Sequence, residues 1–160
     1  MLPLKKILCP TDFSEPSCEA IKEASELALH FASELILIHV VTPIPIIPVS
    51  PGSTVINLPS YQQELEVYAK NMLRDLVEEK VPKKVQARTE VILGDPANEI
   101  VRMADDEKVD VIVIATHGLS GWRRLVFGSV AEKVIRVAHC PVLSIRIPSQ
   151  EKKEQGEKEG

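Results

Sequence analysis

The chain has 160 residues, of which 44% are hydrophobic and 26% charged, and its formal net charge is −4. This acidic balance argues against a nucleic-acid-binding surface, and no apolar run reaches the ~20 residues that cross a membrane. The first residues lack the apolar stretch of a signal peptide. The scattered Cys9, Cys18 and Cys140 fit neither a disulfide framework nor a CxxC metal pair. We therefore expect a cytoplasmic protein with free thiols and with no membrane or nucleic-acid partner.

Short apolar segments that are typical of buried strands alternate with segments of helical periodicity. The strands are predicted at residues 5–9, 35–41, 85–93, 109–114 and 142–147. Strands that alternate with helices predict an α/β fold, in which helices cover both faces of an open parallel sheet. We expect one domain over residues 1–148, followed by a charged, disordered tail over 149–160.

The helices are predicted from their start signals and their apolar stripes. Ser14 is an N-cap for the first helix, and Asp95 with Pro96 starts the third. The second helix carries its apolar stripe over residues 65–77. Ser129 and Glu132 have the spacing of a capping box at the start of the fourth helix. Its expected buried residues are Val130, Val134, Ile135 and Ala138.

A proline-rich segment from Thr42 to Pro59 interrupts this alternation after the second predicted strand. Its isoleucines and valines make it too apolar for a simple solvated linker. A loop of this length inside a compact domain is typical of a functional or a disordered segment.

The turn after the fourth predicted strand concentrates glycines in "ATHGLSGWRRLVFGS", Ala115 to Ser129. Glycine allows a close approach of the backbone to a ligand, and the turn ends at a helix N-terminus, which attracts anions. In a parallel sheet, ligands sit beyond the carboxyl ends of the strands where the strand order reverses. The segments Pro10–Asp12 and Val40–Val41 should therefore meet this turn around a phosphate-containing ligand.

The sequence resembles the universal stress protein family in its nucleotide-binding branch. The resemblance is carried by KKILCPTDFSE, LILIHVV, GDPANEIV and ATHGLSGWRRLVFGSVAEKVIRVAHCPVLSIR, and it spans residues 4–147. It implies a Rossmann-like fold of five parallel strands in the order 3-2-1-4-5. The family's phosphate pattern is G-x2-G-x9-G-S/T, which Gly118, Gly128 and Ser129 match and from which Ala115 departs.

The resemblance implies that the chain binds ATP, with Mg²⁺ held mainly by the phosphates. Pro10, Thr11 and Asp12 would lie beside the adenosine, and Val40 would contact adenine through its backbone. The residues implied around the ribose and the phosphates are Ile114, Ala115, Gly118, Gly128, Ser129 and Val130. Ala131 stands where nucleotide-binding members can carry a hydroxyl, which removes one phosphate donor.

Local alternatives exist for the polar residues of this predicted site. Asp12 either faces the ligand or braces the turn after the first strand. His39 is expected to be a core histidine with its hydrogen bonds satisfied rather than a ligand. His117 either contacts phosphate or makes a local hydrogen bond. Ser129 caps the helix in either case.

No catalytic motif accompanies the site, and no residue is predicted to be catalytic or to bind metal through its side chain. We therefore expect an ATP-binding sensor or regulator of the stress response with slow or no ATP turnover. The alternative is a protein-interaction module whose site is empty, which Ala115 and Ala131 favour; an ATP-consuming enzyme is a third possibility. The resemblance also implies a homodimer through the last strand, Val142 to Arg146. The sequence points to no specific protein partner beyond a second copy of the chain.

Overall fold

The computed structural model describes residues 2–43, 58–116 and 128–146. The strands are β1 (Lys6–Pro10), β2 (Glu34–Val41), β3 (Gln86–Leu93), β4 (Val111–Ala115) and β5 (Val142–Ile145). The helices are α1 (Glu15–Phe31), α2 (Leu58–Lys80), α3 (Pro96–Asp106) and α4 (Ser129–Val137). All neighbouring strands pair in parallel, and their order is β3-β2-β1-β4-β5, which confirms the predicted fold class. The predicted tail 149–160 and residues 44–57 lie outside the described residues.

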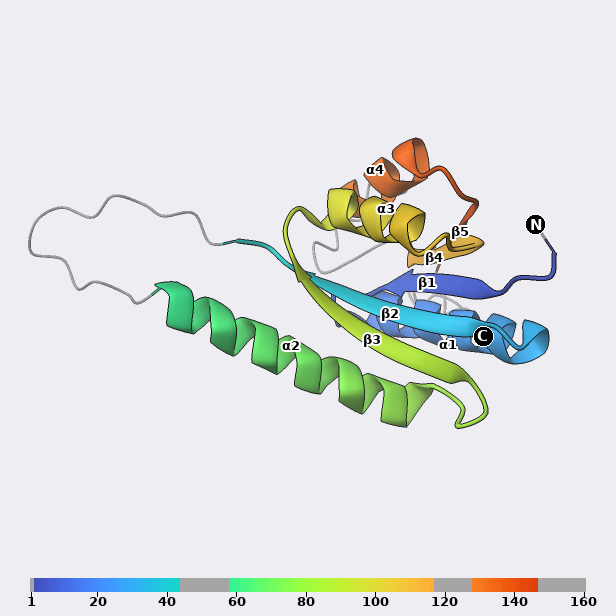
Figure 1. Cartoon of the computed structure of the whole chain (residues 1–160), viewed down its shortest axis with the longest axis horizontal. Helices are drawn as coiled ribbons and strands as arrows, with labels where there is room; N and C mark the ends of the chain where they lie inside the picture. The colour runs from blue at the N-terminus through green and yellow to red at the C-terminus, as the bar shows by residue number, and fades with distance from the viewer. Residues whose placement is uncertain (1, 44–57, 117–127, 147–160) are drawn as a thin grey trace, which may run out of the picture.

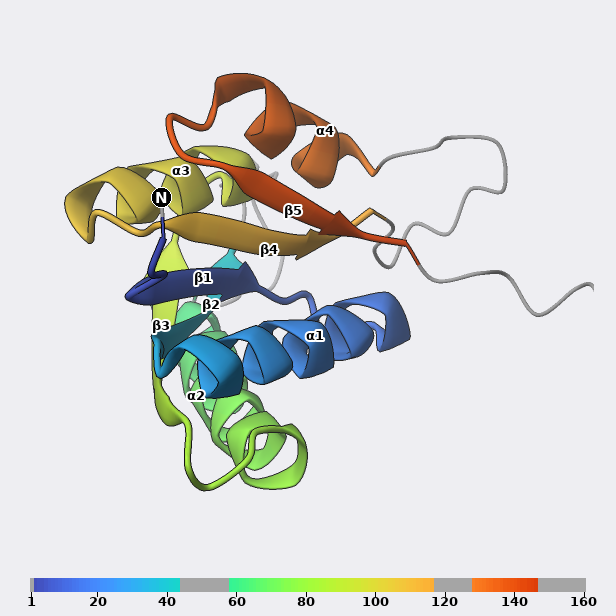
Figure 2. The same cartoon turned by 90° about the vertical axis from the view of Figure 1, so that its right-hand side faces the viewer.

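The sheet is the middle layer of three (Figure 1, Figure 2). Helices α1 and α2 cover one of its faces, and α3 and α4 cover the other. The chain first moves outward from β1 to β2 and β3, then crosses back to β4 and β5 on the other side of β1. Because parallel crossovers are right-handed, this reversal of direction places the later helices on the opposite face.

The core lies in two layers because the side chains of a strand alternate between the faces of the sheet. Ile7 and Cys9 of β1 belong to the cluster beneath α1 and α2, whereas Leu8 belongs to the cluster beneath α3 and α4. All of these side chains are fully buried. The continuous apolar runs of the sequence are therefore explained by burial on both faces.

The predicted starts of α1 and α3 are confirmed. The Ser14 side chain accepts a hydrogen bond from the Ser17 N–H, and Asp95 accepts one from the Asn98 N–H at 3.0 Å.

The prediction for α4 was wrong in two details. Its N-cap is Gly128, and Ser129 is the first helical residue, so Ser129 does not cap the helix. Of the predicted buried residues, Val134 is buried and Val130 and Ala138 pack half-buried against the core, but Ile135 is 41% exposed, and Ala131 is buried in addition. Ile135 therefore lies outside the stripe that α4 packs against α3 and β5.

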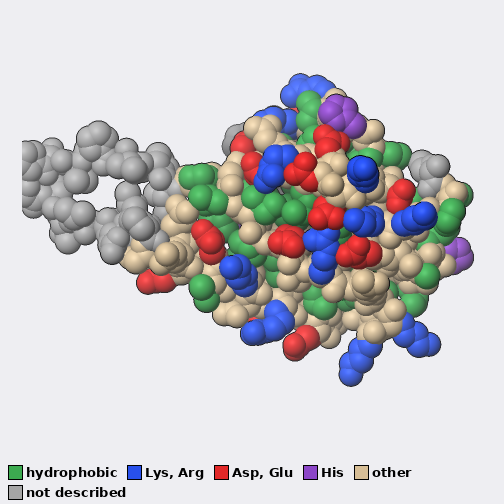
Figure 3. Space-filling view, viewed as in Figure 1, with side chains coloured by type: hydrophobic (Ala, Val, Ile, Leu, Met, Phe, Trp, Pro, Cys, Tyr) green, Lys and Arg blue, Asp and Glu red, His purple; other side chains and the backbone are tan. Residues whose placement is uncertain are grey.

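Acidic and basic side chains are interspersed on the face that Figure 3 shows. At the amino ends of the strands, Arg88 of β3 pairs with Glu34 of β2 at 2.7 Å and with Glu107 after α3 at 2.8 Å. Lys6 of β1 also contacts Glu107, at 2.8 Å. This network ties three neighbouring strands to the end of α3, at the edge of the sheet opposite to the site described next.

Candidate functional site

A crevice opens between the carboxyl ends of β1 and β4. The two strands pair only at Ile7 with Val111 and at Leu8 with Ile112, although β1 continues to Pro10 and β4 to Ala115. Beyond this short ladder, the chain leaves β1 toward α1 and leaves β4 toward α4, on opposite faces of the sheet. The strand order reverses at this point, which is where ligands bind in open parallel sheets.

The crevice contains a cavity of about 280 Å³. Every predicted site residue within the described part of the chain lines it: Pro10, Thr11, Asp12, Val40, Ile114, Ala115, Gly128, Ser129 and Val130. The predicted residues His117 and Gly118 lie outside the described residues. The structure thus brings the sequence-predicted residues together, and their part in binding stays a prediction.

Other lining residues were not predicted as part of the site: Ser17, Ile38, His39, Pro96, Ile100, Thr116 and Ala131. Ser17 and Pro96 lie in the first turns of α1 and α3. The helices that follow β1 and β3 begin at the same edge of the sheet as the turn after β4. The rule that ligands bind beyond the carboxyl ends of the strands would have indicated both residues if it had been extended to the first turns of these helices.

The N-terminus of α4 borders the cavity without a side-chain cap. No side chain in the described part of the chain caps this helix, in contrast to α1 and α3. The first helical hydrogen bond runs from the Glu132 N–H to the Gly128 carbonyl at 2.9 Å. The N–H groups of Ser129, Val130 and Ala131 precede it and have no partner among the described residues. Such unpaired N–H groups at the positive end of a helix favour an anion.

The backbone of Val40 borders the cavity from β2. The Thr11 N–H donates to the Ile38 carbonyl at 2.9 Å, so the peptide groups of Ile38 face β1. Because peptide groups alternate along a strand, those of Val40 face the same side. β1 pairs with β2 only as far as Pro10, opposite Ile38. The Val40 N–H and C=O therefore lie past the end of this ladder, beside the cavity.

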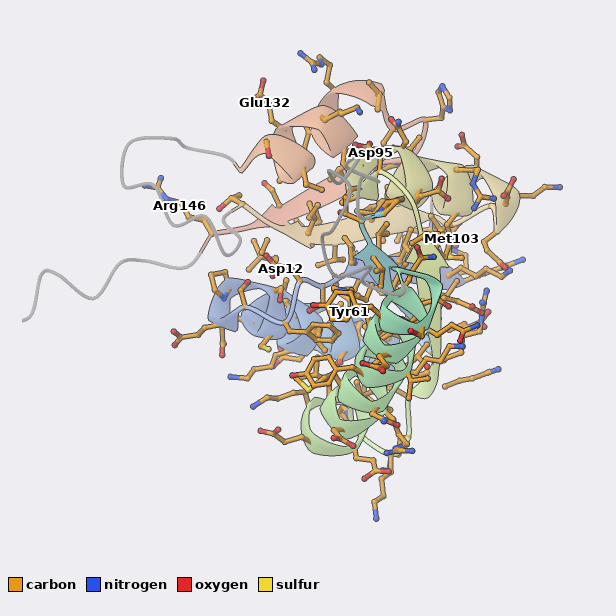
Figure 4. All side chains as sticks on the ribbon, turned by 90° about the vertical axis from the view of Figure 1, so that its left-hand side faces the viewer. Asp12, Tyr61, Asp95, Met103, Glu132 and Arg146 are labelled. Atoms are coloured by element: carbon orange, nitrogen blue, oxygen red, sulfur yellow. The ribbon has the colours of Figure 1, made fainter. Side chains whose placement is uncertain are left out.

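Asp12 braces the turn between β1 and α1. Its Oδ1 accepts a hydrogen bond from the Ser14 N–H at 3.1 Å and another from the Ser14 hydroxyl. Asp12 also lines the cavity, so its bracing of the turn is compatible with the prediction that it faces a ligand. Figure 4 looks onto this edge of the sheet and shows Asp12 beside the start of α1.

His39 has the satisfied hydrogen bond that was expected for a core histidine. Its Nδ1 lies 2.8 Å from the Thr11 carbonyl oxygen, and its side chain is half-buried. It is also among the residues that line the cavity, which the sequence did not indicate.

An ion pair joins α3 and α4, the two helices that cover the same face of the sheet beside the cavity. Lys133 of α4 donates to Asp95 Oδ1, at the start of α3, at 3.0 Å. The hydrogen bond from the Asn98 N–H holds the pKa of the Asp95 carboxyl below its usual range, and the hydrogen bond from Lys133 lowers this pKa further. Figure 4 shows Asp95 and Glu132 on this side of the sheet, across from Asp12.

The described lining contains one charged side chain, Asp12, among mostly apolar and hydroxyl residues. Within residues 2–43, 58–116 and 128–146, no group of His, Cys, Asp and Glu is arranged to hold a metal ion. Among the same residues, no helix is both long and apolar enough to span a membrane.

Comparison with known proteins agrees with the fold. The universal stress protein family model matches residues 3–146. Universal stress protein MJ0531 of Methanocaldococcus jannaschii is 39% identical over 147 residues, which cover 92% of this chain and 85% of the relative. The solved MJ0577 protein of the same organism superposes with a TM-score of 0.72 at 30% identity, covering 91% of this chain and 98% of that one. UspA from Lactobacillus plantarum gives 0.74 at 25% identity, covering 89% and 98%. The chain therefore belongs to the universal stress protein family.

Proposed function

We propose that this protein binds ATP in the cavity between β1 and β4 and acts as a cytoplasmic, nucleotide-dependent regulator of the stress response. The observation that carries the proposal is the N-terminus of α4, which borders the same cavity as the Val40 backbone. Within the described residues, this N-terminus has no side-chain cap and its first N–H groups have no partner. The helix N-terminus suits a phosphate, and the Val40 backbone suits the edge of a base. An adenine nucleotide carries both groups.

The Val40 peptide groups explain why adenine is the expected base. A backbone N–H can donate to adenine N1, and a backbone carbonyl can accept from the adenine N6 amino group. Guanine presents the reverse pattern at these positions, with an N1–H donor and an O6 acceptor. Apolar side chains such as Ile38 and Ile100 would pack against the faces and edges of the base.

Slow or no turnover is the expected consequence of this lining. Hydrolysis needs an aligned water and cationic groups that stabilise charge on the transferred phosphoryl group. The described lining holds Asp12 as its one carboxylate and contains no lysine or arginine. Mg²⁺ would enter with the nucleotide and would be held mainly by its phosphates. We therefore propose binding and regulation rather than catalysis by the described lining.

Two more distant proteins of this fold support the ligand class. One universal stress protein, 21% identical, is known in complex with cAMP. Another, from Archaeoglobus fulgidus and 22% identical, is known in complex with dAMP. Both ligands are adenine nucleotides, although identity at this level shows only the shared fold.

Titration calorimetry with Mg-ATP tests the proposal. We expect one site per chain and a dissociation constant in the micromolar range, which is about −8 kcal/mol. Acid release and chromatography of nucleotide from the freshly purified protein would support the same conclusion. No heat and no thermal shift at millimolar ATP would contradict it and would favour the protein-interaction module instead.

The proposal includes a homodimer formed through β5, which lies at one edge of the sheet. The N–H groups of Ile112 and Thr116 donate to the carbonyls of Pro141 and Ile145 at 3.0 and 2.9 Å. By alternation, the peptide groups of Leu143 also face β4, while those of Val142 and Ser144 face away from the sheet. Exposed Ile135, Val137 and Leu143 add apolar surface on α4 and β5. Pairing with a second copy would satisfy the free edge.

A further inference from the structure

The turn between β1 and α1 holds an aromatic residue in an unusual backbone conformation. Phe13 has a φ of 64°, in the left-handed region that bulky side chains rarely adopt. Thr11 and Asp12, the two residues before it, line the cavity. A conformation of this kind persists only where the surrounding structure holds it in place.

A chain of hydrogen bonds holds the turn from the α1 side. The Phe13 N–H donates to Thr11 Oγ1 at 3.0 Å, and Thr11 Oγ1 lies 2.8 Å from Ser17 Oγ. Ser17 Oγ donates to the Ser14 carbonyl at 2.9 Å. Because Ser17 uses its proton there, the Thr11 hydroxyl must donate to Ser17. The donor and the acceptor of each hydroxyl hydrogen bond are thus determined, and both side chains are buried.

His39 holds the same turn from the β2 side, through two contacts. Its Nδ1 lies 2.8 Å from the Thr11 carbonyl oxygen. A carbonyl can only accept, so Nδ1 carries the proton and donates. The imidazole also lies against the Phe13 ring, with centroids 4.3 Å apart and planes inclined by 30°. These contacts fix the residues on either side of Asp12.

We propose that His39 is a positioning residue of the nucleotide site. It acts through Thr11 and Phe13, and it keeps the Thr11–Phe13 turn in the shape that forms one wall of the cavity. This inference rests on the proposed function for its ligand. It adds that the His39 side chain controls the affinity of the site, to which β2 also offers the Ile38 side chain and the Val40 backbone.

Substitutions at His39 separate the hydrogen bond from the volume of the ring. His39→Leu fills much of the space but leaves the Thr11 carbonyl without its donor. His39→Asn places an amide nitrogen near the position of Nδ1 and can keep that bond. His30 offers a matched control, because it packs edge-on against Phe31 at 4.8 Å near the end of α1, at the opposite end of that helix from the cavity.

Two measurements decide the proposal. The first is amide hydrogen exchange of Phe13 without nucleotide, checked beside circular dichroism for an intact fold. The second is ATP affinity by calorimetry. For His39→Leu we expect faster exchange at Phe13 and an affinity about tenfold weaker, the size of one lost hydrogen bond. His39→Asn should restore most of both, and His30→Leu should change neither.

Unchanged exchange at Phe13 in His39→Leu would show that His39 does not hold the turn. Faster exchange with unchanged ATP affinity would show that the turn does not shape the site. An equal loss of affinity in the Leu and Asn variants would also overturn the proposal, because the bond would then not matter. If the unmodified protein binds no ATP, the proposed function fails and the role of His39 in binding fails with it, whatever the exchange data show.

Discussion

Replacing Gly128 with aspartate would place a carboxylate at the N-cap of α4, where the phosphates are expected. Gly128 has φ −69° and ψ 154°, an extended conformation that any residue adopts and that suits an N-cap. An aspartate there would accept hydrogen bonds from the N–H groups of Val130 or Ala131, which are unpaired in the described structure. The substituted side chain would therefore occupy the anion site itself.

The structure predicts opposite effects of this substitution on stability and on binding. Capping and the helix dipole should raise the free energy of unfolding by about 0.3–1 kcal/mol. Two like charges about 4 Å apart, at an effective dielectric constant of about 20, repel by about 4 kcal/mol. That repulsion corresponds to a dissociation constant for ATP about a thousandfold higher. The variant should thus be slightly more stable and should bind ATP only in the millimolar range.

Thermal unfolding with and without Mg-ATP, together with calorimetry, measures both effects. ATP should raise the midpoint of the unmodified protein and leave that of Gly128→Asp unchanged. Gly128→Asn is the matched control, since it caps the helix without adding a charge and should lose less affinity. A folded Gly128→Asp protein that binds ATP as the unmodified protein does would refute the placement of the phosphates at α4.

Three further predictions concern the base, the sheet edge and acid stability. GTP should bind at least about tenfold more weakly than ATP, because guanine mismatches the Val40 peptide groups; equal affinities in competition calorimetry would contradict this recognition. Ser144→Pro removes an N–H that faces away from the sheet and should yield a monomer in sedimentation velocity, whereas a Ser144→Pro dimer would show that copies pair elsewhere. Leu143→Pro removes an N–H that faces β4 and should instead lower the unfolding temperature. The backbone N–H groups of Lys6 and Lys5 lower the pKa of the Asp110 carboxyl. The charged carboxylate therefore stabilises the fold at pH values above the ordinary carboxyl pKa, and this stabilisation is lost as the pH falls through the lowered pKa. Asp110→Asn should therefore destabilise the protein at pH 7 and lose this effect in acid; a difference in denaturant midpoint that persists in acid would rule out the charge as its cause.

Much of the fold could be predicted because its signals are local. The continuous apolar runs of β1, β2 and β4 indicated strands that are buried on both faces. Ser14 and Asp95 indicated the starts of α1 and α3, since a capping side chain bonds within its own turn. The meeting of Pro10–Asp12, Val40 and Gly128 followed from one rule, because the carboxyl ends of parallel strands share an edge.

Other features depend on contacts between distant residues. The Gly128 N–H donates to the Thr116 carbonyl, and Gly128 is the N-cap, so α4 starts at Ser129, one residue earlier than a Ser129 cap implies. The spacing of Ser129 and Glu132 alone fits a capping box equally well. The short β1–β4 ladder and the direction of the Val40 peptide groups are set by strand register, which an apolar run does not encode. The contacts of His39 with Thr11 and Phe13 likewise appear only when β2 lies beside β1.

Backbone amide NMR during a titration with Mg-ATP tests the central claim most directly, because it reports binding and its location together. We expect the largest chemical-shift changes at the amides of Ser129, Val130 and Ala131, with a further change at Val40. Saturation should occur in the micromolar range. Shifts that gather on another surface, or no shifts at millimolar ATP, would contradict the assignment of the cavity between β1 and β4 as a nucleotide site.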